Sequence, residues 1–264
     1  ATEWAKLGDL FVSDGFGVVH RAQASVTELA AALPHAAGLL VKAEVEVFSK
    51  VLGKPDRPYV VILGGSKVSD KLQVIQNLLN NVDRLVIGGG MCFTFLAAQV
   101  YPVGDSICER DQIEICKKLL AGPVPIHLPE DLVGLDAQGV YQTFGIRLPD
   151  GAKGLDIGPG SAAAFTDIIM DARSVFWNGP MGMFEDPIFM PGTKSIAEAL
   201  VEATKKKSVS VIGGGDSVSA IEELGISFDS FSHVSTGGGA SIEFIEGKTL
   251  PGISCLDRKE KVKK

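Results

Sequence analysis

The sequence has no long hydrophobic run, and this absence excludes a helix that spans a membrane. The longest apolar stretch, residues 30–41, is interrupted by Pro34, His35 and Gly38, whereas a membrane span needs about 18 consecutive apolar residues or more. The start of the chain also has no basic segment followed by an apolar one, as a secretory signal would have. The first residue is Ala and not an initiator Met, which is typical of a processed product or a fragment.

Cysteine is scarce, and its spacing suits neither a zinc site nor a disulfide framework. Cys92, Cys108, Cys116 and Cys255 form no C-x-x-C pair and have no His at a zinc-like interval. Free thiols are typical of a reducing compartment, so we expect a cytoplasmic protein.

An excess of positive charge is also lacking. The 25 Lys and Arg are outnumbered by 32 Asp and Glu, which gives a formal net charge of -7. Such a chain has no general attraction to nucleic acid, so we expect neither nucleic acid nor a membrane as a partner, and any phosphate binding must be local. The basic cluster at 258–264 is interpreted as a solvated tail, with an interaction arm as the alternative.

A recurring pattern fills most of the chain: a short β-branched run ends in glycines and a helical pattern follows. The turns concerned are residues 64–65, 88–90, 178–180, 213–215 and 236–239. Strands that alternate with helices indicate a parallel sheet buried on both faces. We therefore predict an α/β fold, a three-layer Rossmann-like open parallel sheet with helices on both faces.

In such a sheet all five turns lie at the carboxyl edge, where open α/β sheets bind ligands. Glycine lets the backbone approach a ligand closely, and the helix N-termini that follow favour phosphate. Any single turn of this kind is explained by tight packing alone. Five together favour a phosphate-binding edge.

Charged residues follow two of these turns. Lys67 and Lys71 are predicted to lie one turn apart at the start of a helix, where two cations cost stability unless an anion is bound; the alternative is two solvated lysines partly compensated by Asp70. Asp216 and Ser217 are either helix caps or, for Asp216, a Mg²⁺ ligand beside phosphates. The helix start at 237–239 could stabilise a phosphoryl group in transfer.

The segment before the repeating pattern differs from it. Residues 36–52 read as one helix with two apolar stripes, which is expected of a helix buried between two lobes. Prolines within 54–58 then break the helix. We place the main domain boundary near Ala36.

Three motifs are incomplete. Residues 247–249 end like a Walker A motif, but position 242 is Ile where the first Gly is required. Residues 158–163 match a G-x-G-x-x-A dinucleotide fingerprint, but only the short run 155–157 precedes them and no acidic residue ends the next strand. Residues 20–22 lack the Asp and Asn of a protein-kinase catalytic loop.

Several long motifs resemble one family, phosphoglycerate kinase. They are residues 62–71, 86–91 with 93–96, 177–185, 213–217 and 233–241, and the opening at 11–22 is similar as well. The resemblance implies reversible, Mg²⁺-dependent phosphoryl transfer in glycolysis, by a monomer, between 1,3-bisphosphoglycerate plus ADP and 3-phosphoglycerate plus ATP.

The resemblance also implies site residues. Lys67, Lys71 and Gly237, Gly238 and Gly239 are the catalytic set, and Asp216 holds the nucleotide's metal. The nucleotide-binding set comprises Gly65, Lys67, Lys71, Gly89, Asn178, Pro180, Glu185, Gly215, Asp216 and Ser217. Arg21 reaches the triose phosphate from the other lobe.

The family's N-terminal, triose-binding lobe is nearly all absent from this sequence. The resemblance divides the chain into a remnant of that lobe at 1–35, an interdomain helix at 36–54, a nucleotide-binding domain at 55–250, and a tail at 251–264 that returns to the missing lobe. Two interpretations stay open. The chain is either the nucleotide lobe of a phosphoglycerate kinase or, by itself, an ADP/ATP-binding module without turnover.

Overall fold

A parallel sheet of six strands forms the centre of the structure, a computed structural model that describes residues 1–256. The strand order is β11-β10-β9-β3-β4-β5, and every neighbouring pair is parallel. The strands are β3 (Tyr59–Leu63), β4 (Arg84–Ile87), β5 (Ile126–His127), β9 (Ser174–Asn178), β10 (Val209–Gly213) and β11 (His233–Val234). All five predicted glycine turns follow strands of this sheet and therefore lie at its carboxyl edge.

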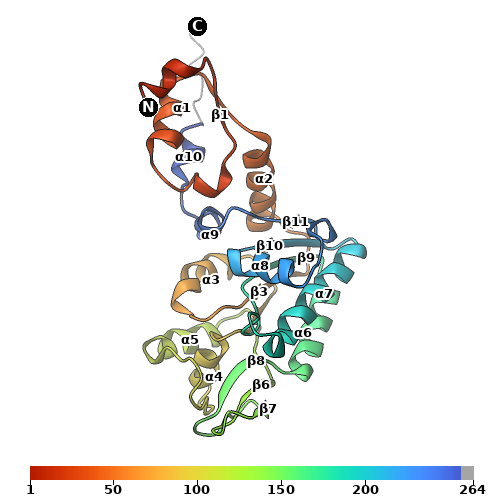
Figure 1. The fold of residues 1–264 in the computed structure, drawn as a ribbon. Coiled ribbons are helices and arrows are strands. Elements are labelled where there is room, and N and C mark those ends of the chain that lie inside the picture. The colour runs from red at the N-terminus through yellow and green to blue at the C-terminus, as the bar shows by residue number, and fades with distance from the viewer. Residues whose placement is uncertain (257–264) are drawn as a thin grey trace.

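Helices cover both faces of the sheet, as Figure 1 shows with α3, α4 and α5 on one side and α6 and α7 on the other. The first face carries α3 (Leu72–Leu78), α4 (Cys92–Ala98), α5 (Ile113–Leu120) and α9 (Gly239–Ile245). The second carries α6 (Pro159–Asp171), α7 (Pro191–Lys205) and α8 (Gly215–Glu223). The predicted three-layer α/β fold is confirmed.

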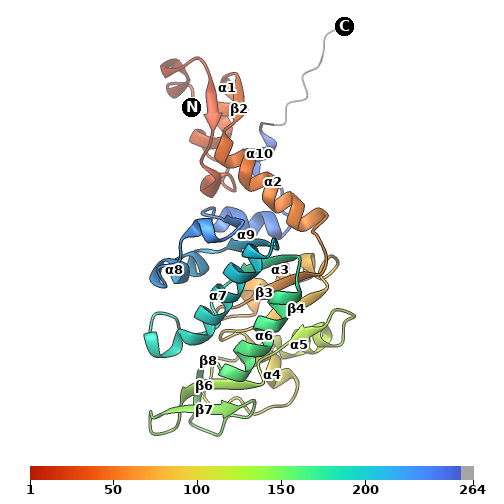
Figure 2. The ribbon, with the colours of Figure 1, turned by 90° about the vertical axis from the view of Figure 1, so that its right-hand side faces the viewer.

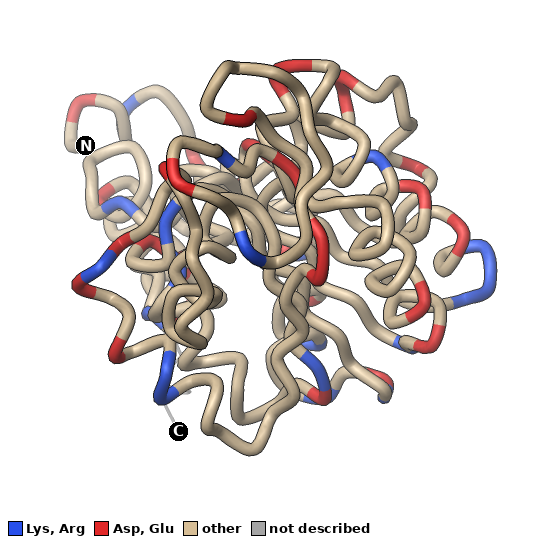
Figure 3. Tube along the Cα trace, turned by 90° about the horizontal axis from the view of Figure 1, so that it is seen from below, with Lys and Arg blue, Asp and Glu red and all other residues tan. Residues whose placement is uncertain are grey.

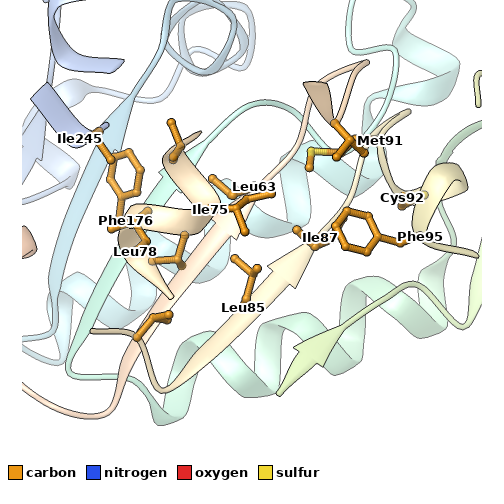
Figure 4. Packing of buried hydrophobic residues seen from close by; sticks show 14 of the residues in the cluster. Leu63, Ile75, Leu78, Leu85, Ile87, Met91, Cys92, Phe95, Phe176 and Ile245 are labelled. Atoms are coloured by element: carbon orange, nitrogen blue, oxygen red, sulfur yellow. The ribbon is translucent and has the colours of Figure 1, made fainter. Parts of the chain in front are cut away.

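The two cores follow from the alternation of side chains along each strand. In β3, Val61 and Leu63 belong to one cluster of buried residues, and Val60 and Ile62 belong to the other. Figure 4 shows the first cluster, where strand residues such as Leu63 meet Ile75 of α3. Each fully buried aliphatic side chain stabilises the fold by about 1.5 to 3 kcal/mol, so both faces contribute to holding the carboxyl edge in place.

A second, smaller sheet was not indicated by the sequence pattern. It is antiparallel, in the order β7-β6-β8. Its strands are β6 (Asp131–Leu135), β7 (Tyr141–Gly145) and β8 (Lys153–Ile157). The run at 155–157 therefore belongs to β8 of this sheet and not to the parallel one. Strand β7 is largely exposed, which explains why it lacks the apolar signal of a buried strand.

The helix α2 (Leu39–Gly53) begins three residues later than the predicted 36–52 helix because residues 35–37 pair with β1 instead. Its start is held by Asp14, whose carboxylate accepts the N–H groups of Leu40 (2.7 Å) and Val41 (3.0 Å). The residues buried on it are Val41, Glu44, Phe48 and Val51. One of the two apolar stripes predicted on this helix, which starts at Leu40, is not buried along its whole length, since the Leu40 side chain is exposed at the start of the helix.

Residues 1–38 form a group of short elements beside and above α2 (Figures 1 and 2). They are three short helical turns (Trp4–Leu7, Phe16–Val18 and Ala24–Glu28), α1 (Leu29–Ala32), and the parallel strands β1 (Phe11–Ser13) and β2 (His35–Ala37). The chain returns here with α10 (Pro251–Ser254), where Gly252 donates its N–H to the carbonyl oxygen of Val19 (2.8 Å). The lobe boundaries proposed from the sequence stay predictions.

Charge is distributed without a large patch of one sign along the trace in Figure 3, where acidic and basic residues are interspersed. Within residues 1–256, no helix has the length and apolar character that a membrane crossing requires. The predicted basic tail at 258–264 lies outside the described residues.

Candidate active site

Three of the glycine turns are bonded to one another at the carboxyl edge. Gly64 donates its N–H to the carbonyl oxygen of Asn178 (2.9 Å), and Gly65 donates to that of Pro180 (3.0 Å). A Cβ at Gly89 would lie 2.6 Å from the nitrogen of Gly65 and 2.8 Å from the Pro180 carbonyl oxygen. Glycine is required here because backbones of different turns touch. The turns therefore form one continuous backbone surface.

A cavity of about 250 Å³ opens where these turns meet β8. Its size is near the lower end of small-molecule sites, about 300 to 1,000 Å³. Five of the residues predicted to bind a nucleotide line it: Gly65, Gly89, Pro180, Glu185 and Asp216. The structure thus brings together in one wall residues that lie far apart in the sequence.

The apolar side of this cavity was not predicted from the sequence. Its lining also includes Phe93, Ile107, Leu132, Leu155 and Phe184. Leu132 and Leu155 belong to the small antiparallel sheet, which no pattern placed beside the glycine turns. Phe93 and Phe184 fall within the motifs 93–96 and 177–185, and their aromatic character next to glycines was the one signal available. An apolar wall opposite exposed backbone suits a flat ring with polar edges.

The side chain of Lys71 also lies at the carboxyl edge of the parallel sheet. Its ammonium group donates to the side-chain oxygen of Asn178, so two residues predicted for the phosphates meet. Burial lowers the pKa of Lys71, and the carboxylates of Asp216, Asp70 and Glu246 partly oppose this shift. An anion bound here would stabilise the charged ammonium.

Lys67 is placed differently from the prediction. Helix α3 begins only at Leu72, and the turn Ser69–Lys71 before it is a 3-10 helix. Lys67 and Lys71 therefore do not lie one turn apart on a single helix, and that local prediction is wrong. Lys67 is exposed in the loop that follows Gly65. A loop position leaves its side chain free to reach across the edge.

The turn at 213–217 supplies one carboxylate and one internal bond. Gly215 and Asp216 are exposed at the start of α8. Asp216 does not cap this helix, whose N-cap is Gly214 without a side-chain bond. Ser217 is buried, and its hydroxyl oxygen accepts the N–H of Gly179 at 2.6 Å. Ser217 thus joins this turn to its neighbour, while Asp216 faces the cavity.

The turn at 237–239 ends β11 and starts α9. Gly238 has a φ of 52°, a left-handed conformation that favours glycine. The N–H of Gly237 is donated to the hydroxyl of Ser235 (3.2 Å), so in this structure it is not directed at a ligand. Gly238 and Gly239 stand at the helix start, where the first N–H groups have no partner within the helix.

The N-terminal segment approaches this turn from the opposite side. A Cβ at Gly237 would collide with the Phe16 ring, and one at Gly239 would lie 3.4 Å from His20 Nε2. Arg21 is exposed, and its Nε donates to His20 Nε2 at 3.4 Å. His20 was missed as a candidate. Its position next to Arg21 was the only signal in the sequence.

Asp156 on β8 is a second residue that the sequence did not single out. Its carboxylate accepts the N–H groups of Gly192 (2.6 Å) and Ile157 (2.9 Å) and contributes to the cavity wall. Burial raises the pKa of Asp156 to about 7, although the two N–H donors oppose the shift. This carboxyl holds the start of α7 against β8.

The dinucleotide fingerprint at 158–163 is not a phosphate site in this fold. The carboxylate of Asp131 accepts the N–H groups of Gly160 (2.9 Å) and Ser161 (2.6 Å). It therefore occupies the N–H donors at the N-terminus of α6 that would otherwise bind a phosphate. A bound phosphate would have to displace this internal anion. The partial Walker motif at 247–249 is likewise engaged, since Lys248 pairs with Glu246 at 2.7 Å.

Residues 1–256 contain no group of three or more His, Cys, Asp or Glu side chains that could hold a metal ion by themselves. A metal at this edge would therefore need oxygen ligands from a bound phosphate, with Asp216 as the nearby protein carboxylate. One carboxylate plus substrate phosphates is a common arrangement for Mg²⁺.

Fold and site together define an open α/β protein whose ligand crevice lies at the carboxyl edge of its parallel sheet. The phosphoglycerate kinase family matches residues 1–248. The chain belongs to the phosphoglycerate kinase family.

Individual relatives agree with this assignment. Phosphoglycerate kinase of Mycolicibacterium smegmatis is 56% identical over 253 residues, covering 94% of this chain and 62% of that protein. The structure of phosphoglycerate kinase from Coxiella burnetii superimposes with a TM-score of 0.88 at 38% identity, covering 96% of this chain and 66% of that one. The enzyme from Pyrococcus horikoshii gives a TM-score of 0.84 at 30% identity, covering 97% and 65%. The chain thus spans about two thirds or less of the length of these relatives.

Proposed function

We propose that this chain is the nucleotide-binding part of a phosphoglycerate kinase, which transfers a phosphoryl group between 1,3-bisphosphoglycerate and ADP to give 3-phosphoglycerate and ATP. The observation that carries the proposal is the cavity between the bonded glycine turns, with Asp216 in its lining and Lys71 bonded to Asn178 of the same edge. Family membership supports the reaction, a role in glycolysis, and a cytoplasmic monomer.

The cavity would hold the adenosine of ADP or ATP. Gly65, Gly89 and Pro180 present backbone to one side of it, and Phe184 and Leu155 close the apolar side. Glu185 lies exposed at its rim, where a carboxylate can accept hydrogen bonds from ribose hydroxyls. The phosphates would then extend toward Lys71 and the start of α8.

In the proposed reaction, the bond between phosphorus and the acyl oxygen of the 1-phosphate breaks as a terminal oxygen of ADP forms its bond to phosphorus. The electron pair stays on the departing carboxylate, so no proton transfer is needed. Negative charge spreads over the phosphoryl oxygens during transfer. Lys67, Lys71 and the N–H groups of Gly238 and Gly239 would stabilise that charge.

Asp216 fits the magnesium that accompanies the nucleotide. Its carboxylate is exposed, lines the cavity and stands at the start of α8. When bound with the nucleotide, Mg²⁺ supplies charge neutralisation at the phosphates. Asp216 would hold the ion, and Ser217 would keep the turn of Asp216 fixed through its bond to Gly179.

A second candidate is an ADP/ATP-binding module that performs no turnover by itself. The coverage of 62% of the M. smegmatis protein favours it. Within residues 1–256, the triose side is represented in our proposal by Arg21 with His20 next to it. Phosphoryl transfer needs both reactants held in line, so we propose that this chain alone binds nucleotide and that the complete enzyme turns over.

Calorimetric titration with ADP tests the nucleotide site. The chain should bind ADP more tightly with Mg²⁺ than without, and Asp216→Ala should remove most of this metal effect. Asp229→Ala, which removes an exposed carboxylate away from the cavity, is the matched control and should retain it. Absence of ADP binding, or an undiminished metal effect in Asp216→Ala, would count against the assignment.

A further inference from the structure

The segment 103–109 runs from the small sheet to the turn that carries Lys71. At its first end, Asp105 donates its N–H to the carbonyl oxygen of Ala152 (2.8 Å), and the Ser106 hydroxyl accepts the N–H of Gly154 (2.9 Å). These bonds fix the segment to the strand that forms one wall of the cavity. We call residues 103–109 the connecting segment.

The other end of the connecting segment is hydrogen-bonded to the turn Ser69–Lys71, which we call the lysine turn. One carboxylate oxygen of Glu109 accepts the N–H of Ser69 at 3.0 Å, and the other accepts its hydroxyl at 2.6 Å. The N–H of Glu109 is in turn donated to the hydroxyl of Thr94 (3.1 Å), which is buried on α4. Hydrogen bonds to a charged acceptor are about twice as strong as neutral ones. Glu109 thus connects Ser69 to helix α4 through hydrogen bonds.

Ser69 and Lys71 belong to the same short turn. The 3-10 helix Ser69–Lys71 is closed by a bond from the N–H of Lys71 to the carbonyl oxygen of Val68 (2.9 Å). A shift of Ser69 must therefore move the backbone of Lys71, whose ammonium group reaches Asn178. The carboxylates that raise the pKa of Lys71 are Asp216, Asp70 and Glu246. The link from Glu109 to Lys71 that the structure shows runs through the backbone of this turn.

The middle of the connecting segment touches the cavity. Ile107 is part of the cavity lining, yet 55% of its surface is exposed. A ring bound in the cavity would cover this side chain and gain from its burial. The same short segment therefore borders the base end of the site through Ile107 and holds the phosphate end through Glu109.

We propose that Glu109 is a positioning residue, which sets Lys71 for the phosphates by holding Ser69. The inference rests on the proposed function, because it takes ADP as the ligand. Glu109 itself would contact neither the base nor the phosphates. Its effect on binding passes through the lysine turn.

Titration of the 264-residue chain with ADP and with adenosine tests this inference. Glu109→Ala should weaken ADP binding about fivefold or more, as is typical of coupled sites, and leave adenosine binding within about twofold, since adenosine has no phosphate for Lys71. Glu109→Gln should stay near wild type, because the amide can accept from the Ser69 N–H and donate to its hydroxyl. The control Glu114→Ala removes an exposed carboxylate on α5 and should bind both ligands normally.

A double-mutant cycle separates positioning from general damage. In a Lys71→Met background, Glu109→Ala should cause no further loss of ADP affinity. Any one of four results would overturn the inference. Two concern Glu109→Ala alone, namely equal losses of adenosine and ADP affinity, or an unchanged ADP affinity. The other two are fully additive effects of Glu109→Ala and Lys71→Met on ADP affinity, and a Glu109→Gln variant that binds ADP as weakly as Glu109→Ala. If the unmutated chain binds adenosine and ADP to no measurable degree, the proposed function itself fails, and the inference falls with it.

Discussion

Asp156 is a residue whose surroundings set its ionisation. Burial raises its pKa to about 7, well above the value of 3.8 for an ordinary Asp. The folded protein then binds a proton that the unfolded chain releases, so the free energy of unfolding should fall as pH rises from about 4 to about 7. Removing the titratable group should remove this slope.

We therefore expect the free energy of unfolding of Asp156→Asn to depend less on pH than that of wild type between about pH 4 and about pH 7. The variant should gain stability relative to wild type as the pH rises toward 7. Urea unfolding at a series of pH values measures the slope. Asp167→Asn, which replaces an exposed carboxylate on α6, controls for the loss of a surface charge. A difference between Asp156→Asn and wild type that is constant from about pH 4 to about pH 8 would refute the assignment of the titration to Asp156.

Replacement of Lys67 tests whether this exposed loop lysine takes part in ADP binding. If it makes a charge-assisted contact to a phosphate, Lys67→Ala should cost about 1.5 to 3 kcal/mol of ADP binding free energy. Lys206→Ala removes an exposed lysine at the end of α7, before β10 starts at the amino edge of the sheet, and should cost nothing measurable. Equal affinities of the two variants would make Lys67 an ordinary surface lysine.

At the scale of elements, the bonded glycine turns should be the least tolerant part of the site. A Cβ at Gly64 would collide with the carbonyl oxygens of Pro180 and Gly179. Because backbone cannot rotate away as a side chain can, Gly64→Ala should destabilise the fold by about 3 kcal/mol, which is the upper end of the range typical of overpacking.

Thermal or urea unfolding of Gly64→Ala gives this value, and Gly145→Ala is the matched control. Gly145 lies on β7, and a Cβ added there would meet no atom within 4 Å, so its replacement should change stability little. A Gly64→Ala variant as stable as Gly145→Ala would show that the turns are not held against one another as described.

The parallel sheet and its glycine turns could be predicted from the sequence because their signal is local. Each strand is a short apolar run, and each turn needs glycine for a physical reason that the neighbours reveal, as at Gly89 between Gly65 and Pro180. The apolar wall of the cavity could not be predicted in this way. It depends on where β8 docks, which is a tertiary contact between elements distant in sequence.

Individual roles within the turns were harder to predict than the turns themselves. Ser217 was expected to bind nucleotide, yet its hydroxyl is engaged by the N–H of Gly179. Gly237 was expected to donate to a phosphoryl group, yet its N–H is bonded to Ser235. Such internal bonds compete with ligand contacts and become visible only when the turns lie next to one another. The assignment of each predicted site residue to a ligand remains a proposal.

At the scale of the whole molecule, the central feature is a site with two sides. The sheet edge contributes the cavity, Lys71 and Asp216, and the N-terminal segment brings His20 close to Gly239. Helix α2 joins these parts, and the buried Glu44 on α2 pairs with His233 of β11 at 2.9 Å. The proposed transfer between two substrates would need both sides, since holding reactants in line can lower a barrier by about 7 to 11 kcal/mol.

The most direct measurement is a coupled assay of ATP formation from 1,3-bisphosphoglycerate and ADP, run on this chain and on the same chain joined to a complete N-terminal lobe of a phosphoglycerate kinase. We expect this chain alone to bind ADP but to have negligible turnover, and we expect the two-lobed protein to recover turnover, because only then is the triose held opposite the nucleotide. Near-normal turnover by the chain alone would contradict the need for two sides. A two-lobed protein that binds ADP and stays inactive would contradict the proposed reaction.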